Sequence, residues 1–137
     1  DGVTVRLESR SEPEIVANAF ALTSAFENVL RNAIHHSPPG AEVLVTLDAD
    51  SRAAVIDIED RGPGLEPGEE ETVFDAFYRG PRAMASGRAG TGLGLAIAAR
   101  AVRLHGGTIL ASNRENGGLR IRMTLPTSKN AGSVASR

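Results

Sequence analysis

Three short stretches of the chain carry side chains that could act on a ligand. In the first, Asn28 and Asn32 stand four residues apart in a segment with helical periodicity, so their side chains share one helix face. Neutral amides can supply oxygen ligands to Mg²⁺ when a bound nucleotide provides the negative charge. His35 lies seven residues after Asn28 and joins that face. A pair of solvated surface asparagines is the alternative, and the pair taken alone favours it.

The second stretch, DRGPG from Asp60 to Gly64, follows an apolar run with strand-like alternation. The alternation places Asp60 on the face of Ile56 and Ile58, where a buried carboxylate needs a hydrogen-bond donor. The amino group of adenine is such a donor, whereas guanine has an oxygen at that position. Gly62 and Gly64 would let the backbone approach a flat base closely. A turn in which Asp60 caps its own loop explains this stretch equally well when it is taken alone.

The third stretch, GTGLGL from Gly90 to Leu95, leads directly into a helical pattern. The N–H groups and the positive dipole end at a helix start attract phosphate, and glycines remove side chains that would block it. The spacing matches neither the dinucleotide-binding GxGxxG nor the Walker A motif. A structural glycine-rich loop is the alternative for this motif alone. The three stretches together, in this order, indicate a single ligand-binding cleft.

The elements that must position these stretches follow from periodicity and from turn residues. Strands are predicted at Val3–Leu7, Glu42–Leu47, Ala54–Asp60, Thr108–Ser112 and Leu119–Leu125, and Ile15–Val16 is a candidate for one more. A long helix is predicted between its N-cap Asn18 and Ser37. Its buried stripe is Leu22, Phe26, Val29, Leu30 and Ala33.

The second half of the chain holds two further predicted helices. A short one is expected within Glu69–Phe77, and a long one over Leu93–Leu104. The residues of the long helix expected to share one side are Leu93, Ile97, Ala101 and Leu104. The loop Arg79–Gly92 before it is long enough to be functional. This order of elements predicts helices layered on one face of a mixed sheet.

Composition limits the class of protein. The chain has 137 residues and a net charge of −2, which fits one domain and argues against a general nucleic-acid binder. The absence of cysteine excludes disulfides and thiolate metal sites and fits a reducing compartment. Residues 1–126 are expected to form the domain, and residues 127–137 a disordered tail. A chain that begins at Asp1 is expected to be a fragment or a processed chain.

The motifs resemble those of the catalytic domain of histidine kinases, in the superfamily shared with gyrase, MutL and the heat-shock chaperone ATPases. Phe26–Ser37 resembles the family's N box, Asp60–Gly64 its first glycine box, Phe74–Phe77 its F box and Gly90–Gly94 its second glycine box. The resemblance extends from about Val3 to Pro126 and is greatest to the envelope-stress sensor type. It implies the Bergerat fold, an α/β (α+β) two-layer sandwich. Its mixed, mostly antiparallel sheet would have about five strands, with about three helices on one face and ATP between the layers.

The resemblance also implies a role for each site residue. Asn32 would bind Mg²⁺ with help from Asn28, and Asp60 would read the adenine amino group. Arg79 falls where the family often keeps a basic residue near the terminal phosphate, and it completes the catalytic set with the two asparagines. The other implied nucleotide contacts are His35, His36, Gly62, Gly64, Tyr78, Gly90, Thr91, Gly92, Leu93 and Gly94, with Arg82–Arg88 as a lid. His35 departs from the usual Lys or Arg, because histidine is only partly charged near neutral pH.

Asn28 separates the enzyme classes of this superfamily. The ATP hydrolases and serine kinases of this superfamily generally have, at the position of Asn28, a Glu that acts as the general base. The side-chain amide of Asn28 cannot accept a proton at neutral pH. The resemblance therefore implies a histidine kinase domain that passes the γ-phosphoryl of Mg·ATP to a separate dimerisation domain, for relay to a response regulator. None of His35, His36 and His105 lies in the family's acceptor pattern, so the chain is expected to bind ATP without phosphorylating itself.

Two alternatives to a histidine kinase domain stay open at this point. One is a superfamily ATPase or serine kinase, and the other is a regulatory nucleotide-binding module. For the kinase, the resemblance implies a cytoplasmic domain of an inner-membrane sensor. Such a domain would make no direct contact with the membrane or with nucleic acid.

Overall fold

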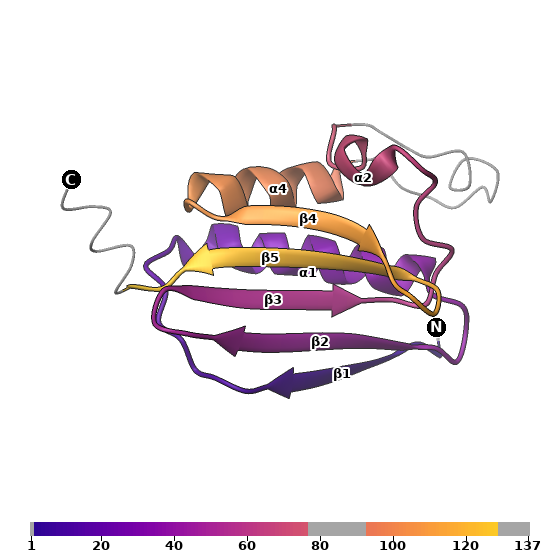
Figure 1. Ribbon diagram of the computed structural model, residues 1–137, viewed down its shortest axis with the longest axis horizontal. Helices are drawn as coiled ribbons and strands as arrows, with labels where there is room; N and C mark the ends of the chain where they lie inside the picture. Colours follow the sequence, from indigo (N-terminus) through magenta and orange to yellow (C-terminus); the bar gives the residue numbers. More distant parts are fainter. Residues whose placement is uncertain (1, 77–92, 129–137) are drawn as a thin grey trace.

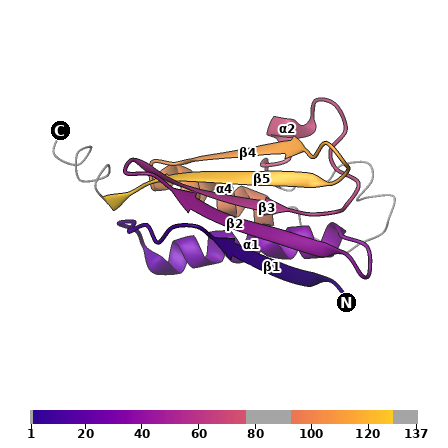
Figure 2. The same cartoon turned by 60° about the horizontal axis from the view of Figure 1, so that its bottom comes forward.

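The computed structural model describes residues 2–76 and 93–128, which form one sheet with helices on a single face (Figure 1). The strands are β1 (Thr4–Ser9), β2 (Glu42–Ala49), β3 (Ala53–Glu59), β4 (Thr108–Asn113) and β5 (Leu119–Pro126). The helices are α1 (Ala19–His36), α2 (Glu69–Thr72) and α4 (Gly94–Leu104). Figure 2 shows the two long helices on the same side of the sheet.

The strands follow the order β1-β2-β3-β5-β4 across the sheet. Strands β1 and β2 are parallel, with Val5 opposite Val43, and every other neighbouring pair is antiparallel. A parallel pair needs a long crossover, and α1 supplies it. The expectation of a mixed, mostly antiparallel five-stranded sheet with three helices is confirmed.

Helix α1 begins and ends where its local chemistry requires. The Asn18 side chain accepts a hydrogen bond from the Ala21 N–H at 2.9 Å, as an N-cap should. Ser37 has extended backbone angles (φ −83°, ψ 142°), which is the conformation favoured before Pro38. The predicted stripe faces the core: Leu22, Val29 and Ala33 are buried, and Phe26 and Leu30 pack against the core as partly buried side chains.

The side of α4 predicted to carry Leu93, Ile97, Ala101 and Leu104 is not the main buried face of the helix. Ile97 and Leu104 are 45% and 73% exposed, and Ala101 is the one buried residue among the four that were predicted to share this side. The buried face instead consists of Leu95, Ala98, Ala99 and Val102. Small alanines let α4 approach α1 closely, where Ala25 is also fully buried.

Two further expectations concern the edges of the domain. Ile15–Val16 forms no strand, because Pro13 lacks an N–H just before it and Val16 is 70% exposed. Thr127, the first residue of the expected tail, is buried, and its N–H and hydroxyl donate to Arg52 O and Ser51 O. Residues 129–137 lie outside the described residues, so their disorder stays a prediction.

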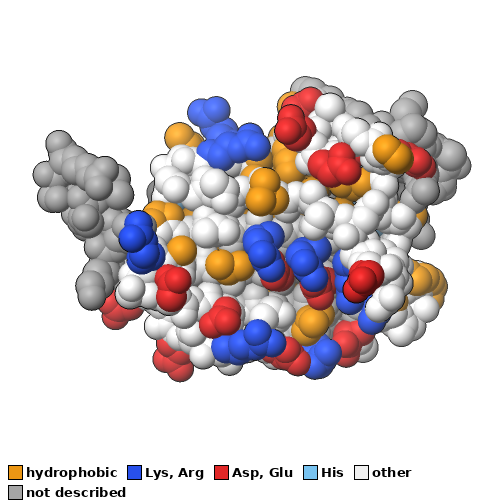
Figure 3. Space-filling model, in the orientation of Figure 1, with side chains coloured by type: hydrophobic (Ala, Val, Ile, Leu, Met, Phe, Trp, Pro, Cys, Tyr) orange, Lys and Arg blue, Asp and Glu red, His pale blue; other side chains and the backbone are white. Residues whose placement is uncertain are grey.

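The face of the sheet that carries no helix is polar, with charges of both signs side by side (Figure 3). Arg122 and Asp57 lie opposite each other on β5 and β3 and form a two-pronged ion pair, with both N···O distances 2.8 Å. Arg120 Nε donates to Glu59 Oε2 at 2.6 Å in the next register position. Within residues 2–76 and 93–128, no helix combines the length and the apolar character needed to cross a bilayer.

Candidate functional site

Asp60 lies at the carboxyl end of β3, directly after the last strand residue. It is 2% exposed and shares the inner face with Ile56 and Ile58, as the alternation predicted. Its carboxylate accepts hydrogen bonds from the Gly62 N–H at 2.8 Å and the Leu119 N–H at 3.0 Å, and both donors reach Oδ1. The Asx turn foreseen as an alternative is therefore present. It uses one of the two carboxylate oxygens.

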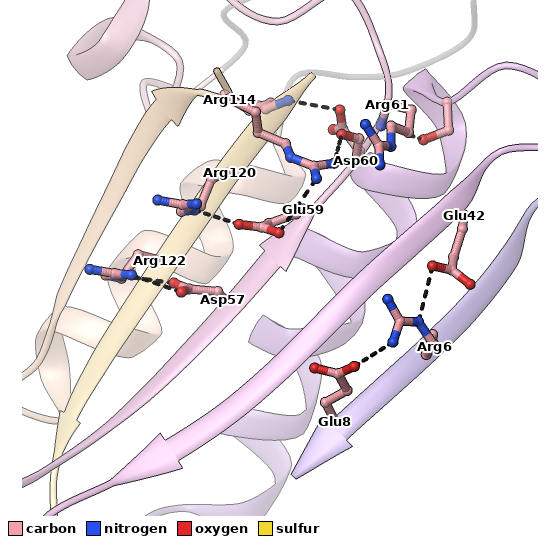
Figure 4. Close-up of polar contacts among 12 residues, drawn as sticks. Arg6, Glu8, Glu42, Asp57, Glu59, Asp60, Arg61, Arg114, Arg120 and Arg122 are labelled. Atoms are coloured by element: carbon pink, nitrogen blue, oxygen red, sulfur yellow. Dashed lines mark hydrogen bonds and ion pairs between the residues drawn. The ribbon is translucent and has the colours of Figure 1, made fainter. Parts of the chain in front are cut away.

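The surroundings of Asp60 disfavour its charge. Burial raises the pKa of the Asp60 carboxyl above its usual value of 3.8, and the hydrogen bonds from Gly62 and Leu119 and the charge of Arg114 offset that effect in part. Figure 4 shows the Arg114 side chain, from the turn between β4 and β5, lying next to Asp60 and Glu59. A buried carboxylate of this kind gains most from a further donor, which a ligand can supply.

The loop after Asp60 packs directly on the end of α1. A Cβ added at Gly62 would lie 2.6 Å from the His36 carbonyl oxygen, so no larger residue fits without a shift. The Arg61 N–H donates to the Ser37 hydroxyl at 3.2 Å. These contacts leave an open hollow of about 380 Å³, lined by His36, Pro38, Arg61, Gly62 and Pro63. The end of the N-box helix and the first glycine box therefore line the same hollow.

Asn28 meets the start of α4. Its side-chain Nδ2 donates to the Ser24 carbonyl oxygen at 2.8 Å, so its Oδ1 is the atom directed away from the helix backbone. A Cβ added at Gly94 would lie 3.3 Å from this oxygen. The last glycine of GTGLGL therefore lies against the amide oxygen that the sequence singled out as a candidate ligand.

The remaining predicted residues of α1 lie along the same helix. Asn32 is partly buried one turn after Asn28. His35 is exposed and His36 partly buried, with their ring centroids 5.3 Å apart in an edge-to-face arrangement. Leu93, partly buried, precedes the first residue of α4. Tyr78, Arg79, Gly90, Thr91, Gly92 and the expected lid lie outside the described residues.

His105 has a different place from the other two histidines. Its Nε2 accepts a hydrogen bond from the Asn18 N–H at 3.0 Å, and its Nδ1 lies 2.7 Å from the Ala101 carbonyl oxygen. This pairing requires the neutral ring with its proton on Nδ1. The Nδ1 contact lies within the last turn of α4, and the Nε2 contact joins the end of α4 to the start of α1.

Sequence reasoning missed the residues that support the Asp60 loop from behind. Asn113 and Arg114, at the end of β4 and in the turn to β5, bond to the backbone of Leu65 and Asp60. A partial signal in the sequence is the Gly117-Gly118 doublet, because adjacent glycines indicate a tight turn. Gly118 has φ +102°, and a Cβ there would lie 2.0 Å from the Asp60 carbonyl oxygen.

Comparison with known families agrees with this arrangement of motifs. The family of histidine kinase-, DNA gyrase B- and HSP90-like ATPases matches residues 17–129. The chain belongs to this family. The matched residues include the Asn-bearing helix, the Asp60 loop and the start of α4.

Individual members of this family that resemble the chain are sensor histidine kinases. The sensor histidine kinase CpxA of Escherichia coli K12 is 40% identical over 115 residues, which are 84% of this chain and 25% of CpxA. The sensor protein KdpD of the same strain is 44% identical over 99 residues, 72% of this chain and 11% of KdpD. The chain thus spans a quarter or less of these two relatives.

Solved structures agree with the family assignment. The mycobacterial sensor histidine kinase MprB has a TM-score of 0.81 and 32% identity over 92% of this chain and 83% of that chain. The ATP binding domain of PrrB from Mycobacterium tuberculosis has a TM-score of 0.73 and 29% identity over 93% and 82% of the two chains. The chain therefore matches most of the length of each of these two solved chains.

Proposed function

We propose that this domain binds Mg·ATP and donates its γ-phosphoryl group to a histidine on a separate dimerisation domain, for relay to a response regulator. The observation that carries the proposal is Asp60, buried at a strand end beside the N-box helix with one carboxylate oxygen already used by the backbone. Its other oxygen, Oδ2, would accept from the adenine amino group. Gly62 and Gly64 would lie along the base.

The amides of α1 fit a magnesium ion that arrives with the nucleotide. The Ser24 contact orients the Asn28 oxygen toward Gly94, where a phosphate-binding helix start is expected. Asn32 lies one turn further along the same helix and would be the principal protein ligand. Magnesium keeps water and phosphate oxygens among its ligands, so two neutral amides are a sufficient protein contribution. The ion would neutralise negative charge on the phosphates during transfer.

The other residues of the proposed nucleotide site follow the family pattern. His35, His36, Tyr78 and Arg79 would contact base, ribose or phosphate, and Gly90, Thr91, Gly92, Leu93 and Gly94 would surround the phosphates. The domain would contribute position and charge stabilisation rather than a base of its own, since Asn28 stands where a hydrolase keeps Glu. The parent protein would be an inner-membrane sensor with this domain in the cytoplasm.

Calorimetry with a non-hydrolysable ATP analogue tests the binding half of this proposal. We expect binding that strengthens with Mg²⁺ and exceeds the binding of GTP. Arg122→Ala is a matched control, because it removes an ion pair from the uncovered sheet face without touching the site. Absence of ATP binding, or equal affinity for GTP, would contradict the proposal.

Radiolabelled ATP tests the transfer half. We expect no label on this chain alone, because both nitrogens of His105 are engaged and neither His35 nor His36 lies in an acceptor motif. Label should appear on a dimerisation domain of the parent kinase added in trans. Failure of that transfer, with ATP binding intact, would favour a regulatory nucleotide-binding module. Hydrolytic turnover that survives Asn28→Ala would favour a superfamily ATPase or serine kinase.

A further inference from the structure

Two adjacent residues at the turn between β4 and β5 support the Asp60 loop, although they are distant from that loop in sequence. Asn113 Oδ1 accepts from the Leu65 N–H at 2.7 Å, and Asn113 Nδ2 donates to the Leu65 carbonyl oxygen at 2.9 Å. One side chain thereby satisfies both backbone groups of one residue. Only an amide can do this, because it presents one acceptor and one donor side by side.

The second support holds the other end of the loop. Arg114 Nη1 donates to the Asp60 carbonyl oxygen at 2.8 Å, and Arg114 Nη2 lies 3.7 Å from Glu59 Oε1 (Figure 4). The Arg114 side chain is 17% exposed and that of Glu59 12%, so this contact is shielded from water. The loop from Asp60 to Leu65 is therefore held at both its first and its last residue.

Close packing restricts movement of the Asp60 loop relative to the turn between β4 and β5. A Cβ at Gly64, whose φ is +77°, would lie 2.6 Å from Asn113 Oδ1. The Asp60 N–H also donates to the Leu119 carbonyl oxygen at 2.9 Å. The carboxylate of Asp60 can hold its direction only if the backbone that carries it is fixed, and these contacts fix that backbone.

We propose that Asn113 and Arg114 are positioning residues that set the affinity and the base selectivity of nucleotide binding without touching the nucleotide. The inference rests on the proposed function, because it assumes that the Asp60 loop reads the base. Asn113 would hold the far end of the loop against the turn. Arg114 would hold Asp60 so that its carboxylate faces the adenine amino group.

The test uses two ligands that differ at one position of the base. ATP has an amino group at position 6 where ITP has a carbonyl oxygen and, next to it, a proton on N1, so only ATP offers the 6-amino donor assigned to Asp60. We expect the double variant Asn113→Ala/Arg114→Ala to bind ATP about tenfold more weakly, the effect of one to two lost hydrogen bonds. ITP affinity should change much less, so the ATP-to-ITP preference should collapse. The Arg122→Ala variant should keep that preference.

The outcomes separate this inference from the proposed function. If the native chain prefers ATP and Asp60→Asn abolishes that preference, the base pocket is established independently. An unchanged ATP-to-ITP preference in Asn113→Ala, in Arg114→Ala and in the double variant, each folded by circular dichroism, would then overturn the positioning role. A parallel loss of affinity for both ligands would overturn it as well, because general destabilisation does not distinguish the two bases.

Discussion

Replacing Asp60 with asparagine should change which base the domain prefers. Oδ1 of Asp60 accepts from two backbone N–H groups, those of Gly62 and Leu119. In Asp60→Asn the amide oxygen must keep this place, since an NH₂ group there would face two donors. The NH₂ group then takes the position of Oδ2. It would point toward the adenine amino group, a donor facing a donor.

The size of the effect follows from the contact that is lost. A hydrogen bond to a charged group contributes about 1.5–3 kcal/mol, so ATP affinity should fall about 10- to 100-fold. ITP has a carbonyl oxygen at that position, so the new NH₂ group can donate to it and ITP affinity should rise. The variant should therefore bind ITP at least as well as ATP.

A loss of folding stability should not account for the change in nucleotide affinity of Asp60→Asn. Burial raises the pKa of Asp60, which means that the folded surroundings disfavour the carboxylate relative to water. An uncharged amide of the same shape should therefore leave the free energy of unfolding within about 1 kcal/mol of the native value. Urea unfolding measures this quantity, and calorimetry with ATP and ITP measures the two affinities. Unchanged ATP affinity, or an equal loss for both ligands, would refute the assignment of Asp60 to the base.

Three further predictions concern pH and two structural residues. Because the raised pKa of Asp60 makes the folded chain retain a proton that the unfolded chain loses above pH 3.8, the contribution of this carboxyl to stability should fall as pH rises from 3.8 through its folded-state pKa. The lowered pKa of Asp50 gives a contribution of opposite sign, so the measurement is the difference between the urea titrations of the native chain and of Asp60→Asn across this range. Gly118→Ala should destabilise the domain by at least about 2 kcal/mol more than Gly117→Ala in the same assay. Both glycines have positive φ (+102° and +98°), but only a Cβ at Gly118 meets the Asp60 carbonyl oxygen; equal losses would contradict the clash. His105→Ala should cost about 1 kcal/mol, because the Asn18 N–H loses its acceptor, and an unchanged midpoint of thermal unfolding would show that this bond adds nothing.

Local chemistry made much of the fold predictable. The Asn18 cap, the stop at Ser37 before Pro38 and the inward face of Asp60 each depend on neighbours within a few residues, and all three are as expected. The buried side of α4 was not predictable in this way. Its alanines are buried because α1 lies against them, and nothing in the α4 sequence alone indicates that neighbour.

The residues of the candidate site also differ in whether the sequence alone could identify them. Asn28 and Gly94 were recognisable as motif residues, and the structure brings them together. Asn113 and Arg114 were not recognisable, because their partners Leu65 and Asp60 are 48 and 54 residues away in sequence. A polar residue in a turn has no local pattern that indicates a distant backbone partner. Such residues become visible only when the loop that they support is placed in three dimensions.

The uncovered face of the sheet has a consequence for how the domain meets other molecules. Its arginines lie beside carboxylates: Arg122 with Asp57, Arg120 with Glu59, and Arg6 with Glu42 at 3.1 Å. At distances beyond the Debye length, about 10 Å at 0.1 M salt, neighbouring opposite charges largely cancel. These pairs therefore give an approaching macromolecule almost no attraction or repulsion over long range. Encounter rates at this face should depend on diffusion and shape, and they should vary little with ionic strength.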